Sequence, residues 1–244
     1  MNEANVKIYI DYFRKHFYDV VSLNREQSDF KKILYFTIID SLSKSIYPSD
    51  GNRERILNFL EIIVDWKNGQ LFSLPHLFAF FKLLPEPQYF ELKNFIIEKY
   101  KAMKTGWVYS IDEIDILYND ILKFNSTIIN DIFDKKSKKS IYQFQHLNLF
   151  YTYRNSLIHE MKPLGSDNTR IKKQEIPHYL SHLEYQVEPD LVEGYWHLSY
   201  PETFLKNICR VSIIKTEEYL LRNDIDPYYK TNKGYFWIEG LNTI

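Results

Sequence analysis

Hydrophobic residues recur every three or four positions along most of the chain, which is the spacing of one face of an α-helix. The first stretch illustrates the pattern with Val6, Ile8, Tyr9, Tyr12, Phe13, Phe17 and Val20. Pro, Gly and polar clusters interrupt the pattern and mark the ends of the elements. Together these signals predict helices over about residues 3–22, 28–47, 50–66, 74–84, 88–103, 110–134, 140–161 and 201–222.

Two of these helices carry a recognisable start signal. Ser73 precedes Leu74 and Pro75, which is typical of a capping residue followed by a proline in the first turn. Ser110 is followed three residues later by Glu113, the spacing of a capping box. The sequence therefore predicts that helices begin directly after Ser73 and Ser110.

The pattern changes after residue 163. Residues 164–175 are polar, and residues 178–187 and 194–200 alternate as two short strands separated by a turn. We expect a mainly α protein, a helical bundle with a small β-hairpin inserted before the last long helix. The predicted organisation is a helical core over 1–163, with the hairpin, last helix and aromatic tail over 164–244 packed on the same domain.

Composition narrows the environment and the class of function. The formal net charge is −1, so the chain has no global basic field to attract nucleic acid, and polyanion binding would require local clusters. The single cysteine, Cys209, excludes an internal disulfide and fits a reducing compartment. No apolar run approaches 18 residues, and the N-terminus has no signal core, so we expect a cytoplasmic protein without a membrane span.

The most informative chemical signal is the sequence Arg154-Asn155-Ser156-Leu157-Ile158-His159, at the C-terminal end of the predicted helix 140–161. An Arg separated from a following His by four to six residues is expected about 0.7 times by chance in this composition. Requiring Asn directly after the Arg lowers that expectation to roughly 0.05. The complete pattern is therefore informative, although the bare spacing is not.

The spacing also makes chemical sense. Asn155 and His159 are four residues apart and share a helical face, and the long side chain of Arg154 can swing toward them. A guanidinium binds phosphate bidentately, and an imidazole exchanges protons near neutral pH. A fixed positive charge beside an acid/base group suits phosphodiester transfer without a metal.

With these residues at the end of a long helix in an all-α chain, the sequence resembles the HEPN superfamily. The resemblance implies a helical bundle that forms a homodimer and a metal-independent endoribonuclease of bacterial defence or toxin–antitoxin systems. It also implies that Arg154 and His159 are the catalytic pair, assisted by Asn155. RNA would be the substrate, its own 2′-hydroxyl the nucleophile, and an antitoxin or defence-system protein a further partner. No cofactor and no metal is implied.

Nearby residues are weaker candidates for substrate binding: Tyr151, Lys162, Arg170, Lys172 and Lys173. Lys135, Lys136, Lys138 and Lys139 are also basic, but along a helix they would lie about 30 Å from the motif. A solvated loop is the alternative explanation of both basic runs.

The sequence is compatible with three functional hypotheses. The leading one is the ribonuclease. The second is a catalytically silent HEPN-like module that binds a nucleotide or a protein. The third is a plain helical scaffold in which Arg154 lies on the surface and His159 only complements the helix dipole.

The remaining histidines and tryptophans are interpreted structurally. His178 and His182 would lie about 13 Å apart along a strand, which disfavours a metal site with His197 or Glu184. We interpret His146 as a packed or surface residue. The tryptophans are expected to be core or hairpin anchors: Trp66, Trp107, Trp196 and Trp237.

Overall fold

The computed structural model describes residues 2–84, 89–124, 140–162, 164, 175–182 and 195–228. By their internal contacts the residues divide into two compact units. Unit 1 comprises Met1–Asp65 with Leu205–Ile244, and unit 2 comprises Trp66–Phe204. Within the described ranges, no helix combines the length and the apolar composition that crossing a bilayer requires.

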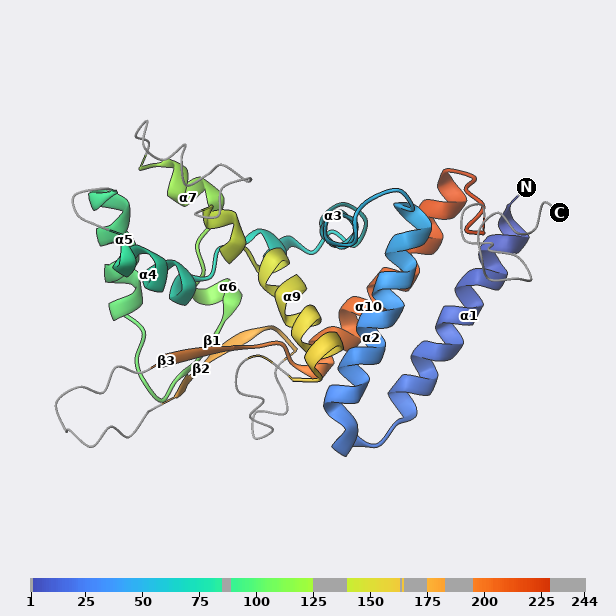
Figure 1. The fold of residues 1–244 in the computed structure, drawn as a ribbon, viewed down its shortest axis with the longest axis horizontal. Helices are drawn as coiled ribbons and strands as arrows, with labels where there is room; N and C mark the ends of the chain where they lie inside the picture. Colours follow the sequence, from blue (N-terminus) through green and yellow to red (C-terminus); the bar gives the residue numbers. More distant parts are fainter. Residues whose placement is uncertain are drawn as a thin grey trace. The chain divides into compact units, whose positions relative to one another are not determined.

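Unit 1 is a set of helices (Figure 1). Its elements are α1 (Glu3–Ser22), α2 (Ser28–Ile46), α3 (Asn52–Asn58), the π-helical segment η2 (Phe59–Ile63) and α10 (Glu202–Arg222) from Leu205 onward. A 3₁₀ turn, η1 (Arg25–Gln27), joins α1 to α2. Most of the apolar residues predicted to share a face over 3–22 are buried in α1, but Ile8 and Tyr12 are 63% and 58% exposed. These helices confirm the periodicity that predicted them, except that the third continues as a π-helical turn.

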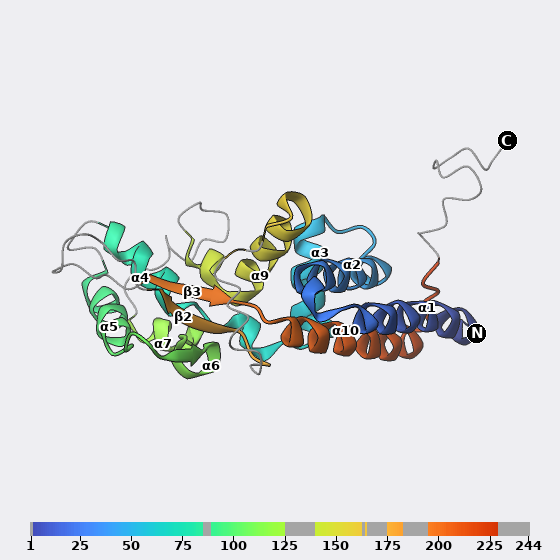
Figure 2. The same ribbon diagram turned by 90° about the horizontal axis from the view of Figure 1, so that it is seen from below.

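Polar contacts join the two ends of the chain within unit 1. Figure 2 shows α10 lying along α1. Arg14 of α1 forms an ion pair with Glu217 of α10, and Asn2 donates hydrogen bonds to Asp224. The ion pair is partly exposed, so it specifies the pairing of the helices more than it stabilises them.

Unit 2 mixes short helices with a small sheet. Its helices are α4 (Leu74–Leu83), α5 (Phe90–Lys101), α6 (Ile111–Ile114), α7 (Tyr118–Leu122) and α9 (His146–Asn155), with 3₁₀ turns η3 (Lys67–Gln70) and η4 (Ile141–Phe144) and a π-helical segment η5 (Ser156–Glu160). Both start signals are confirmed. The Ser73 side chain accepts a hydrogen bond from the backbone N–H of His76, and Ser110 forms the capping box with Glu113.

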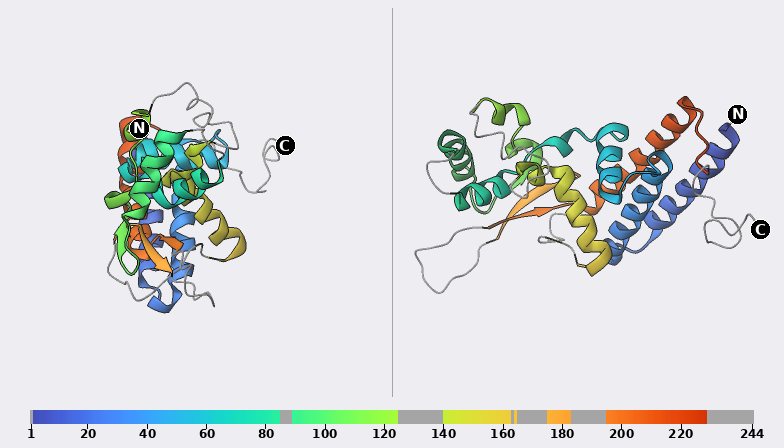
Figure 3. Two further views of the ribbon diagram at one scale, coloured as in Figure 1. Left: turned by 90° about the vertical axis from the view of Figure 1, so that its left-hand side faces the viewer. Right: turned by 45° about the horizontal axis from the view of Figure 1, so that its top comes forward.

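The sheet has three antiparallel strands in the order β1-β2-β3. The predicted hairpin corresponds to β2 (His178–His182) and β3 (Tyr195–Ser199), and β1 (Val108–Ser110) adds a strand that the sequence reading placed in a connection. Three residues are too few to show an alternating pattern, so β1 is specified by pairing with β2. Figure 3 shows the two longer strands beside α9.

Two long predicted helices of unit 2 are interrupted. The prediction for 110–134 is wrong at Asp115, where the extended backbone separates α6 from α7. The prediction for 140–161 is wrong at Gln145, which is extended between η4 and α9. In both places the backbone pairs with Phe72, through bridges to Ile116 and to Gln145. Hydrogen bonds between distant segments of the chain replace the helical hydrogen bonds at these two positions. The tertiary structure therefore overrides the local helical periodicity.

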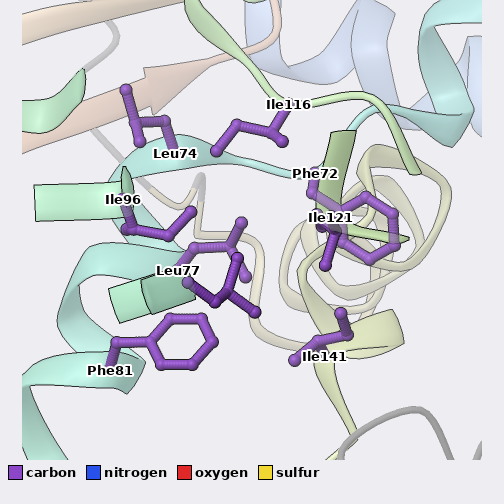
Figure 4. Close-up of a cluster of buried hydrophobic side chains, with 9 residues drawn as sticks. Phe72, Leu74, Leu77, Phe81, Ile96, Ile116, Ile121 and Ile141 are labelled. Carbon is purple, nitrogen blue, oxygen red and sulfur yellow. The ribbon is translucent and has the colours of Figure 1, made fainter. Parts of the chain in front are cut away.

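A hydrophobic cluster lies between the helices of unit 2 (Figure 4). Its members are buried apolar side chains from α4, α5, α7, η4 and the extended segments: Phe72, Leu74, Leu77, Phe81, Leu92, Ile96, Ile116, Ile121 and Ile141. Leu83, at the end of the α4 helix, is 84% exposed and lies outside this cluster. The cluster fixes the segments around Phe72, on which the polar groups described below depend.

Candidate functional site

The motif lies where α9 changes to a π-helical turn. The α-helical bonding ends at Asn155 and η5 continues to Glu160. Met161 then adopts the left-handed conformation, with φ 51°, and its N–H donates to the carbonyl of Ser156. The Ser156 hydroxyl donates to the carbonyl of Lys162 at 2.7 Å, which fastens the helix end. Turns of this type are rare and occur frequently at functional sites.

Arg154 and Asn155 are held together on the last turn of α9. The Arg154 side chain is only 8% exposed, and its Nη1 donates to Asn155 Oδ1 at 2.9 Å. Its Cζ atom also lies 6.0 Å from the centroid of the Tyr151 ring. The hydrogen bond and the cation–π contact both restrict the position of the guanidinium. Arg154 is therefore not an exposed surface residue.

His159 is exposed within η5. Five residues of an α-helix would rotate it about 140° away from Arg154. Hydrogen bonding from residue i to residue i+5 winds more residues into each turn, so a π-helical turn separates the directions of Arg154 and His159 by a smaller angle than an α-helix would. The helix end thus presents an exposed imidazole one turn beyond a buried guanidinium.

The weaker candidates divide into two groups. Tyr151 is half-buried against the guanidinium, and Lys162 is exposed just after the turn. Arg170, Lys172 and Lys173 lie outside the described residues, as do the four lysines at 135–139. Within the described ranges, no three His, Cys, Asp or Glu side chains gather as a metal site would require.

A second polar constellation lies in the interior of unit 2. The Asp115 carboxylate, whose side chain has no exposed area, lies 2.5 Å from Nε2 of His146, the first residue of α9. It also accepts hydrogen bonds from the N–H of Leu74 at 2.8 Å and from the Tyr179 hydroxyl at 2.8 Å. Nδ1 of His146 lies 3.1 Å from the Tyr200 hydroxyl. Asp115 is therefore the acceptor that joins the α4 start, β2 and α9.

The electrostatics of this constellation follow from its burial. Burial raises the pKa of Asp115 above its ordinary value, while the charge and hydrogen bond of His146 oppose that shift. Burial and the charge of Asp115 raise the pKa of Tyr179 well above 10, so the phenol stays a donor. Because the carboxylate is fully covered, we interpret the constellation as structural, a satisfied polar network inside a core. The sequence analysis did not identify Asp115 and Tyr179 as part of a polar network, because neither residue belongs to a recognisable motif.

His76 extends this network toward the surface. Its Nδ1 lies 2.6 Å from Ser73 Oγ, which in turn accepts a hydrogen bond from Tyr179. Burial, followed by the charge of His146, lowers the pKa of His76 from 6.5 to about 4. His76 is therefore neutral in the folded protein at pH values where an unfolded histidine is already protonated.

This shift predicts a pH dependence of stability. Between pH 6.5 and about 4 the unfolded chain binds a proton at His76 that the folded chain does not. The contribution of His76 to the free energy of unfolding is therefore fully present above pH 6.5 and is lost as the pH falls toward 4. Urea denaturation at several pH values should show that His76→Asn flattens this fall. Equal slopes in wild type and His76→Asn would contradict the assignment.

Comparison of the chain with protein-family models, with curated proteins and with solved structures finds no match.

Proposed function

We propose that this protein is a metal-independent endoribonuclease of HEPN type that acts as a homodimer in bacterial defence or as a toxin. The observation that carries the proposal is the helix end itself. There a buried Arg154, oriented by Asn155, precedes an exposed His159 in a π-helical turn. A fixed cation beside a titratable ring is the minimal equipment for metal-free phosphodiester transfer.

In the proposed reaction, the 2′-oxygen of RNA forms a bond to the adjacent phosphorus while the bond from phosphorus to O5′ breaks. The 2′-hydroxyl loses a proton to a base, and O5′ gains one from an acid. His159 takes one of these roles, and a second copy in a dimer would supply an imidazole for the other. Arg154 stabilises the charge that develops on the phosphate oxygens. The products are a 2′,3′-cyclic phosphate and a free 5′-hydroxyl.

The test is to incubate the purified protein with total RNA in EDTA and to identify the new ends. We expect cleavage that EDTA does not inhibit, with 2′,3′-cyclic phosphate ends. A matched 2′-O-methyl RNA should remain intact, because it lacks the nucleophile. Intact RNA at stoichiometric protein would contradict the enzyme and favour the catalytically silent module that binds a nucleotide or a protein.

A further inference from the structure

Trp107 is not the core or hairpin anchor that the sequence suggested. Its side chain is 61% exposed, in the turn between α5 and β1. The other tryptophans with described side chains do pack, Trp66 against Phe150 and Phe204 and Trp196 against Tyr109. Because the Trp107 indole is exposed, it contributes little hydrophobic stabilisation to the folding of this unit. The turn around it is therefore a candidate contact surface.

The turn that presents Trp107 is held in place by hydrogen bonds. Gly106 has a φ of +85°, a conformation that a side chain would disfavour, and its N–H donates to Ser181 Oγ of β2 at 2.8 Å. The N–H of Lys104 donates to the Tyr109 hydroxyl at 3.0 Å. The exposed ring therefore stands on a backbone fixed to the sheet, so little backbone entropy remains to be lost when a ligand contacts it.

The sequence that precedes this ring is basic. Residues 99–107 contain Lys99, Lys101 and Lys104, all exposed, and no Asp or Glu, although the whole chain has a net charge of −1. The Lys104 Nζ atom lies 6.0 Å from the centroid of the Trp107 ring. The nearest acidic residues in sequence are Glu98, on α5, and Asp112 and Glu113, beyond β1. Glu113 is engaged with the N–H of Ser110.

We propose that the basic–aromatic patch, defined as Lys99, Lys101, Lys104 and Trp107, binds single-stranded RNA. This inference rests on the proposed function in taking RNA as the ligand. A base would stack on Trp107, and the lysines would neutralise phosphates on either side. A single strand fits better than a duplex, because the base faces of a duplex are already stacked and cannot cover an indole. The patch thus places the substrate on the same unit that carries the motif.

The experiment measures binding without cleavage. A fluorescent 2′-O-methyl oligonucleotide and the full chain carrying His159→Ala are titrated by anisotropy. Adding Trp107→Ala should weaken binding roughly 5- to 150-fold, and Trp107→Phe should retain most of it. Lys101→Ala with Lys104→Ala should make the negative slope of log affinity against log salt shallower by about 1.4. Tyr18→Ala and Lys15→Ala, at exposed positions of α1, are the matched controls.

The outcomes separate this inference from the proposed function. RNA binding that depends on Trp107 in a protein that cleaves no RNA would support the patch and refute the enzyme. Cleavage with unchanged binding in Trp107→Ala would refute the patch alone. The assignment to single strands would also be overturned if a duplex of the same length bound with equal, Trp107-dependent affinity. Trp107-dependent binding only to anionic phosphatidylserine vesicles would overturn it as well. Thermal unfolding of each variant confirms that it is folded.

Discussion

His159→Ala is expected to slow RNA cleavage roughly 10²- to 10⁴-fold, the range typical for loss of a general acid or base. The side chain is exposed, so its truncation removes little packing and should leave the unfolding midpoint unchanged. The rate should be measured in EDTA with a defined oligoribonucleotide at saturating concentration. Loss of activity without loss of stability would distinguish a reacting group from a structural one.

Two variants sharpen this prediction. His16→Ala, on a histidine of unit 1 outside the motif, is the matched control and should cleave at the wild-type rate. Arg154→Lys keeps the charge but removes the guanidinium fork and its donation to Asn155 Oδ1, so it should also cleave slowly. Wild-type cleavage by His159→Ala would refute the assignment of the motif as the active site.

Asp115→Ala is expected to have the largest effect on folding, lowering the free energy of unfolding by about 3–5 kcal/mol. Its carboxylate is the shared acceptor for the N–H of Leu74, the Tyr179 hydroxyl and Nε2 of His146. Alanine would leave these three polar groups buried without that acceptor, and each such loss costs about 1–3 kcal/mol. Domains have a total stability of about 5–15 kcal/mol, so the change would remove much of it.

Urea denaturation followed by circular dichroism would measure the change. Asp112→Ala, on the exposed side of α6, is the matched control and should shift the midpoint little. Asp115→Asn should cost less than alanine, because its amide oxygen can still accept a hydrogen bond from the groups around it. A midpoint for Asp115→Ala equal to wild type would mean that the network contributes nothing to folding.

Several features could be predicted from local sequence because their causes are local. The helix starts at Ser73 and Ser110 follow from side chains that bond to backbone groups within three residues. The long helices α1, α2 and α10 follow from apolar spacing, because one continuous face is buried along each of them. The motif at 154–159 was identifiable for the same reason, since its members are close in the chain.

The features that sequence reasoning missed depend on residues that are far apart. Asp115, in a predicted helix, has extended backbone, because Ile116 pairs with Phe72. His146, interpreted as packed or surface, is packed, but its partner is a carboxylate 31 residues earlier that the sequence did not indicate. Trp107 was expected to be an anchor, and only the fold leaves it exposed.

The sequence by itself determined the mainly helical character, the starts of several helices and the spacing of Arg154, Asn155 and His159, because these depend on neighbours within one or two turns. The tertiary structure alone decided the third strand, the breaks at Asp115 and Gln145, the buried Asp115–His146 pair and the π-helical turn under His159. The physical reason is that buried hydrogen bonds between distant segments outweigh the small helical preferences of the residues that they join.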